Sequence, residues 1–166
     1  MRSHLRRPAL FVLAAALLST ITIDAQTPAP QGAPAAAVVP ANARTSRFGV
    51  WDNSTNPNNV MTYEIYEKDG SKLTVSNPTN PASDWSYVTL FDGVFRPVTG
   101  QTGAETAVEI INDKSIRISN KRNGVVNQIV INTLSADNNE ISNEYIRLDA
   151  NGKITGVTHV TYKRRK

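Results

Sequence analysis

The chain has 166 residues, no cysteine, two histidines and a formal net charge of +4. The lack of cysteine excludes disulfide bonds and a zinc site of the Cys and His type. Three arginines and one aspartate lie within residues 1–25, so the rest of the chain carries +2, and no binding of nucleic acid is predicted.

Residues 1–25 have the pattern of a secretory signal peptide. Three arginines precede an uncharged apolar run over residues 9–23, and Ala25 provides a small residue at the cleavage position. A membrane-spanning helix needs roughly 20 apolar residues, so this run is short for a membrane anchor, which is the alternative interpretation. We therefore expect an exported protein, periplasmic or extracellular, with no integral membrane span after processing.

Residues 26–46 are predicted to be a disordered linker that is rich in Pro and Ala. Four prolines interrupt a stretch of Ala, Gln and Gly that has too few large apolar side chains to bury a core. We expect a semi-extended tether or an inert N-terminal segment. The remaining residues, 47–166, are numerous enough for one domain that is stable without disulfides.

From residue 59 to residue 166, short apolar-polar runs alternate with tight-turn signals at intervals of roughly 8–12 residues. Pairs such as Asn123-Gly124 and Asn151-Gly152 tolerate the positive φ of hairpin turns. Alternation with a period of two dominates, and no helical period is sustained, so no helix is predicted. Sequential hairpins favour an all-β fold, an antiparallel up-and-down β-barrel of roughly 8–10 strands, with a two-layer sandwich as the alternative.

Two short motifs carry a resemblance to known proteins. The first predicted strand contains Gly49-Val50-Trp51, and the last ends in Tyr162-Lys163-Arg164-Arg165. The Gly-x-Trp motif resembles that of the lipocalins and their calycin relatives, and residues 85–100 are similar to a segment of small secreted bacterial β-barrel proteins of uncharacterised function. The resemblance covers most of residues 47–163. It implies a lipocalin-like barrel in which Trp51 closes one end against a basic side chain of the last strand.

Aromatic side chains on the predicted strands are the candidate ligand-binding residues. They are Trp51, Tyr63, Trp85, Tyr87 and Phe91. Such side chains line an apolar cavity in a carrier, but they fill the core in a structural or interaction module, and the sequence leaves both interpretations open. We expect a monomeric, non-catalytic barrel that binds a small hydrophobic molecule and uses no cofactor or metal.

His159 is the one histidine that follows the predicted signal peptide. If its side chain points inward, it is placed to ligate haem iron, so a haem-binding barrel is a further alternative. Val160 and Tyr162, on the opposite face of the strand, favour an outward His159. Carboxylate pairs such as Glu105 and Glu109 point in parallel along a strand, which favours a solvated outer face over glycosidase chemistry. The protein is therefore not predicted to be an enzyme.

Overall fold

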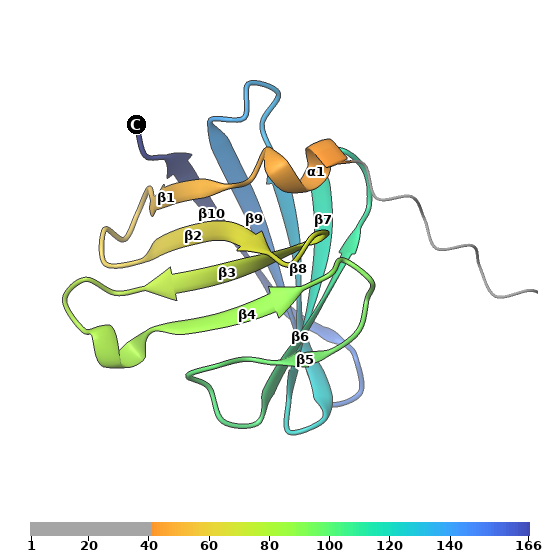
Figure 1. The fold of residues 1–166 in the computed structure, drawn as a ribbon. Helices are drawn as coiled ribbons and strands as arrows, with labels where there is room; N and C mark the ends of the chain where they lie inside the picture. Colours follow the sequence, from red (N-terminus) through yellow and green to blue (C-terminus); the bar gives the residue numbers. More distant parts are fainter. Residues whose placement is uncertain (1–40) are drawn as a thin grey trace, which may run out of the picture. The chain divides into compact units, whose positions relative to one another are not determined.

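The computed structural model describes residues 41–166 (Figure 1). The predicted signal peptide over residues 1–25, and the predicted linker as far as residue 40, lie outside the described residues. Within the described range, no helix has the length and apolar character needed to cross a membrane.

Ten strands form one antiparallel sheet. They are β1 (Gly49–Asn53), β2 (Val60–Tyr66), β3 (Gly70–Ser76), β4 (Trp85–Thr89), β5 (Arg96–Pro97), β6 (Ala104–Ile110), β7 (Ser115–Arg122), β8 (Val125–Leu134), β9 (Glu140–Leu148) and β10 (Ile154–Arg164). Across the sheet the order is β4-β3-β2-β1-β10-β9-β8-β7-β6-β5. Neighbouring strands other than β1 and β10 are therefore consecutive in the chain, as in a series of hairpins (Figure 1).

Pairing at two seams bends this sheet into a nearly closed barrel. At the first seam, β1 pairs with β10 and brings Trp51 opposite Arg164. At the second, between β4 and the segment that follows β5, Ser86 and Thr99 exchange backbone hydrogen bonds of 3.0 and 2.8 Å. β5 has two residues and ends at Pro97, in line with the confinement of proline to sheet edges. The predicted up-and-down barrel is confirmed, and the two-layer sandwich is wrong.

The turn residues and the apolar alternation of the sequence correspond to hairpin turns and inward strand faces in the structure. Asn123 and Gly124 connect β7 to β8 with φ values of 51° and 83°, the positive values that a two-residue hairpin turn requires. Along β8, Val130, Asn132 and Leu134 are buried, whereas the residues between them are not. This alternation assigns one face of each strand to the barrel interior.

One end of the barrel, here called the base, holds a helix that the sequence did not predict. α1 (Ala41–Thr45) lies at this end, followed by the fully buried Arg47 (Figure 1). Residues 41–45 fall within the predicted linker of residues 26–46 and form this helix. A five-residue helix spans little more than one turn, which is too short for a hydrophobic period to show in a sequence.

Trp51 closes the base as the resemblance implied. Its indole is fully buried, and its Nε1 donates a hydrogen bond of 2.9 Å to the backbone carbonyl of Arg47. The guanidinium of Arg164 stacks on the ring, with its Cζ 4.1 Å from the ring centroid. A cation on an indole face is stabilising by about 0.5–2 kcal/mol. The basic partner of Trp51 is thus Arg164, from the last strand.

Arg164 also connects the segment before β1 to the loop between β8 and β9. Its guanidinium and Nε donate hydrogen bonds to the carbonyls of Ser46 (2.6 Å), Phe48 (2.7 Å) and Asn138 (2.8 Å). A Cβ at Gly49 would lie 2.9 Å from Nη1 of Arg164, and the φ of Gly49 is +129°. Glycine at this position therefore allows the strand to approach the guanidinium.

Candidate ligand-binding site

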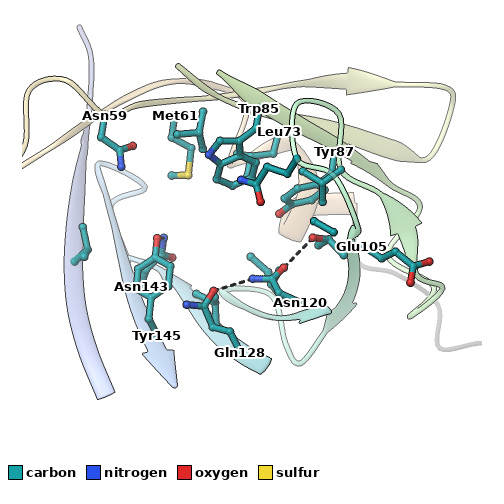
Figure 2. A pocket seen from close by; sticks show the side chains of 18 of the residues that line it. Asn59, Met61, Leu73, Trp85, Tyr87, Glu105, Asn120, Gln128, Asn143 and Tyr145 are labelled. Atoms are coloured by element: carbon teal, nitrogen blue, oxygen red, sulfur yellow. Dashed lines mark hydrogen bonds between the residues drawn. The ribbon is translucent and has the colours of Figure 1, made fainter. Parts of the chain in front are cut away.

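The barrel encloses a cavity of about 460 Å³. Side chains of β2, β3 and β4 form one wall, and side chains of β6 to β9 form the opposite wall (Figure 2). A volume of this size falls in the range of about 300–1,000 Å³ that is typical of small-molecule sites. The barrel interior is therefore not filled by its own side chains.

The first wall is mainly apolar and aromatic. It consists of Met61, Tyr63, Leu73, Val75, Trp85 and Tyr87. The pairing of β2 with β3 and of β3 with β4 places Tyr63, Leu73 and Tyr87 in one cross-strand row, so they share a face. Trp85 and Tyr87 stack with their ring centroids 6.3 Å apart. This wall offers a continuous surface for an apolar ligand body (Figure 2).

The second wall is polar and internally hydrogen-bonded. Thr106 donates to the Oδ1 of Asn120 at 2.8 Å, and the Nδ2 of Asn120 donates to the Oε1 of Gln128 at 2.9 Å. Asn143 and Tyr145 continue this wall toward β9 (Figure 2). The cavity therefore has one apolar side and one side rich in amides and hydroxyls.

A second chain of hydrogen bonds begins at the buried guanidinium of Arg47. Its Nε donates to the Oδ1 of Asn132 at 3.0 Å, and the Nδ2 of Asn132 donates to the Oδ1 of Asn143 at 2.8 Å and to the hydroxyl of Tyr63 at 3.4 Å. The Nδ2 of Asn143 donates onward to the hydroxyl of Tyr145 at 3.1 Å. These side chains connect the base to both cavity walls.

Arg47 is held by oxygen atoms that carry no net charge. Besides Asn132, its guanidinium donates to the backbone carbonyls of Ala43 and, at 2.7 Å, Lys114. Among residues 41–166, no carboxylate forms an ion pair with it, so its positive charge is uncompensated there. Burial lowers the pKa of Arg47, and the nearby Tyr63 and Tyr87 oppose this effect.

Two tyrosines form the deepest part of the apolar wall, here called the floor. Tyr63 and Tyr87 are 3% and 4% exposed. Burial raises the pKa of Tyr63 to about 12 and that of Tyr87 well above its usual value, so both phenols stay protonated at neutral pH. The hydroxyl of Tyr87 is buried and has no hydrogen-bond partner in the described part of the chain.

The cavity opens at the end of the barrel opposite the base. Five polar residues on the loops and strand ends there form its mouth: Asn53, Asn59, Gln101, Arg122 and Asn127. The base is closed by α1, Arg47 and Trp51. Within residues 41–166, the mouth is therefore the entrance that this arrangement offers to a ligand.

The structure brings together three of the five predicted ligand-binding residues. Tyr63, Trp85 and Tyr87 line the cavity. The other two, Trp51 and Phe91, do not line it. Trp51 packs under Arg164 at the base, and Phe91 lies in the core after the end of β4. Both are buried aromatics, and a sequence does not separate an aromatic that faces a cavity from one that fills the core.

His159 lies on the outer face of β10 and is exposed. Val160 and Tyr162, its neighbours on the other face, line the cavity. The haem-binding alternative, which required an inward imidazole, is therefore wrong. Glu105 borders the cavity near one end, but its carboxylate turns away from the space between the walls (Figure 2). No three side chains of the His, Cys, Asp and Glu types come together anywhere in residues 41–166.

Sequence reasoning missed the polar residues of the interior. Asn132 and Asn143 are buried at 0% and 3% exposure, and Arg47 lies before the first strand. A signal for Asn132 was present, since it occupies an alternate position between the apolar Val130 and Leu134. A polar residue at an inward position of a strand points to a buried hydrogen-bond network.

Comparisons with known proteins concern the fold. No protein-family model and no curated protein matches this chain. It is similar to the solved structure of a Schistosoma mansoni fatty acid binding protein in complex with arachidonic acid, with a TM-score of 0.56 and 10% identity over 75% of this chain and 99% of that one. It is also similar to a mutant of the fluorescent protein UnaG, with a TM-score of 0.52 and 11% identity over 73% of this chain and 97% of that one. Both are calycin-type barrels, so the chain has a calycin-type fold.

Proposed function

We propose that this protein is an exported, non-catalytic barrel that binds a small hydrophobic molecule in its interior. The observation that carries the proposal is the cavity of about 460 Å³, which has an apolar aromatic wall and opens at the mouth. The similar barrel of the fatty acid binding protein holds arachidonic acid, which supports the same use of the fold here. The alternative of a module with a filled core conflicts with the cavity.

Burial of apolar ligand surface is the source of affinity in this proposal. Removal of apolar surface from water contributes about 25 cal/mol per Å², and a deep site buries most of a small ligand. The stacked pair of Trp85 and Tyr87 supplies a flat apolar surface beside Met61 and Leu73. Ligand entry does not require the barrel seams to separate, because the mouth is already open.

Tryptophan fluorescence tests the binding site directly. The protein has two tryptophans: Trp85 lines the cavity, and Trp51 is sealed in the base. We expect 1-anilinonaphthalene-8-sulfonate or a fatty acid to change the Trp emission of the wild type, and Trp85→Phe to abolish most of that change. A panel of apolar probes that leaves the emission unchanged and gives no bound species in native mass spectrometry would contradict the proposal.

A variant that fills the cavity provides a second, independent test. Ala104 lines the cavity, so Ala104→Phe places a ring in the space that the ligand would occupy. Val157 is 47% exposed and does not line the cavity, so Val157→Phe is the matched control. We expect the first variant to bind the probe much more weakly and the second to bind it as the wild type does. Equal binding by both would place the probe outside the barrel.

Export and oligomeric state are part of the same proposal. Expression of the full chain in a bacterium should yield a protein in the periplasm or medium whose mass lacks residues 1–25. Size-exclusion chromatography with light scattering should give a monomer. An intact N-terminus with cytoplasmic accumulation would contradict export but would leave the ligand-binding proposal standing.

A further inference from the structure

The hydrogen bonds that begin at Arg47 have a fixed direction. A guanidinium has donors and no acceptor, so the group of Asn132 that faces Arg47 must be its Oδ1. The Nδ2 of Asn132 must then face Asn143 and Tyr63, as the structure shows. The orientation of this amide therefore follows from the chemistry of its partner, whereas an isolated asparagine leaves its two ends ambiguous.

This direction sets the polarity of the cavity floor. The hydroxyl oxygen of Tyr63 accepts a hydrogen bond from Asn132, so its own hydrogen is free to point elsewhere. Tyr87 has a buried hydroxyl with no partner among the described residues, and Figure 2 shows its side chain reaching into the space between the walls. The positive charge of Arg47 interacts with both phenols. It favours orientations in which the hydroxyl oxygens point toward Arg47 and the hydroxyl hydrogens point away from it.

On the basis of the proposed function, we propose that the floor selects ligands whose deep end carries a hydrogen-bond acceptor, a carbonyl or carboxylate oxygen on an apolar body. Tyr63 and Tyr87 donate to that oxygen. Arg47 and Asn132 are positioning residues: the Arg47 donors are engaged by carbonyl oxygens, so its guanidinium acts through Asn132 and through its charge.

Three probes with the same alkyl chain test this selectivity: laurate, methyl laurate and dodecylamine. Methyl laurate carries a neutral acceptor, laurate an anionic acceptor, and dodecylamine a cationic donor. We expect laurate and methyl laurate to bind about tenfold more tightly than dodecylamine, because the amine leaves the tyrosine hydrogens unpaired and places a second positive charge near Arg47. Comparison of laurate with methyl laurate separates the contribution of charge from that of the hydrogen bonds.

Two variants test the residues that we assign to this selectivity. Tyr87→Phe removes one donor and should reduce the ratio of ester to amine affinity by about fivefold. Its matched control is Tyr66→Phe, since Tyr66 does not line the cavity. Asn132→Asp keeps an oxygen against Arg47 but has no N–H to donate to the hydroxyl of Tyr63. The Tyr63 hydroxyl then donates its hydrogen to the new carboxylate, so that hydrogen no longer points toward the ligand. This change should remove the preference while urea unfolding shows a folded protein.

The outcomes distinguish this inference from the proposed function. If the amine binds inside the barrel as tightly as the ester, or if Tyr87→Phe and Asn132→Asp leave the ratio unchanged, the selective floor is wrong although the carrier proposal stands. If none of the three probes competes with 1-anilinonaphthalene-8-sulfonate, and that dye does not bind either, the proposed function itself fails.

Discussion

Replacement of Arg164 by alanine should destabilise the barrel strongly, although Arg164 is the third residue from the end of the 166-residue sequence. Chain ends are commonly expected to tolerate substitution. Here the last strand closes the barrel against β1, and the Arg164 side chain joins that seam to the base. Arg164→Ala removes the stacking on Trp51 and the hydrogen bonds to Ser46, Phe48 and Asn138.

The expected loss can be estimated from these contacts. The cation on the indole contributes about 1 kcal/mol. Hydrogen bonds from a charged donor are worth about 1.5 kcal/mol or more each in buried sites, and less where water can reach the freed carbonyls. The side chain is half-buried, so we expect a loss of about 3 kcal/mol in the free energy of unfolding. A small domain has only about 5–15 kcal/mol in total.

The adjacent arginine provides the control. Arg165 pairs with Asp52 on the surface, where its side chain is 52% exposed, so Arg165→Ala should cost less than about 1 kcal/mol. Equilibrium urea unfolding followed by Trp emission and by circular dichroism gives both values. Equal losses in the two variants, or a loss below about 1 kcal/mol for Arg164→Ala, would refute the role that we give to the Trp51 and Arg164 pair.

Three further predictions follow from the same structure. Gly49→Ala should destabilise by about 1–3 kcal/mol in urea unfolding, more than Gly124→Ala, because a Cβ at Gly49 meets Arg164 whereas one at Gly124 meets nothing within 4 Å. The free energy of unfolding should fall as pH rises above about 10, because burial raises the pKa of Tyr63 and Tyr87, which then ionise more readily in the unfolded chain than in the folded one. In thermal melts above this pH, Tyr87→Phe should lose less stability per pH unit than the wild type. The Arg96 guanidinium lowers the pKa of Asp92 to about 2, so this pair stabilises the folded protein at pH values above the usual Asp pKa. In thermal melts, Asp92→Asn should therefore be less stable than the wild type at neutral pH, and the difference should disappear as pH falls from about 4 to about 2.

The fold could be predicted because its signals are local and repeated. The turn of each hairpin is indicated by its own residues, as at Asn123-Gly124. The inward face of each strand is indicated by the alternation of apolar and polar residues. Trp51 and Gly49 identified the first strand and the end that it closes. The barrel then follows from the addition of neighbouring hairpins, which requires no knowledge of distant contacts until β10 meets β1.

The candidate site was predictable only in part because it depends on contacts between distant residues. Tyr63, Trp85 and Tyr87 were found from their inward alternation, but the same pattern also selected Phe91, which packs into the core. Arg47 contacts Asn132 across 85 positions in the sequence, and nothing near either residue indicates the other. Whether a side chain faces empty space is a property of the opposite wall, which the local sequence does not contain.

The base and the floor of the cavity depend on two arginines from opposite ends of the described chain. Arg47 and Arg164 both direct their guanidinium donors at oxygens that carry no net charge, chiefly backbone carbonyls. A carboxylate partner would offset more of the desolvation of a buried cation, but it would also cancel the field that acts on Tyr63 and Tyr87. Neutral partners accept the hydrogen bonds of the Arg47 guanidinium without cancelling its positive charge, which therefore still acts on the side chains of the cavity. The same choice of partners therefore seals the base and gives the floor its preference for an acceptor.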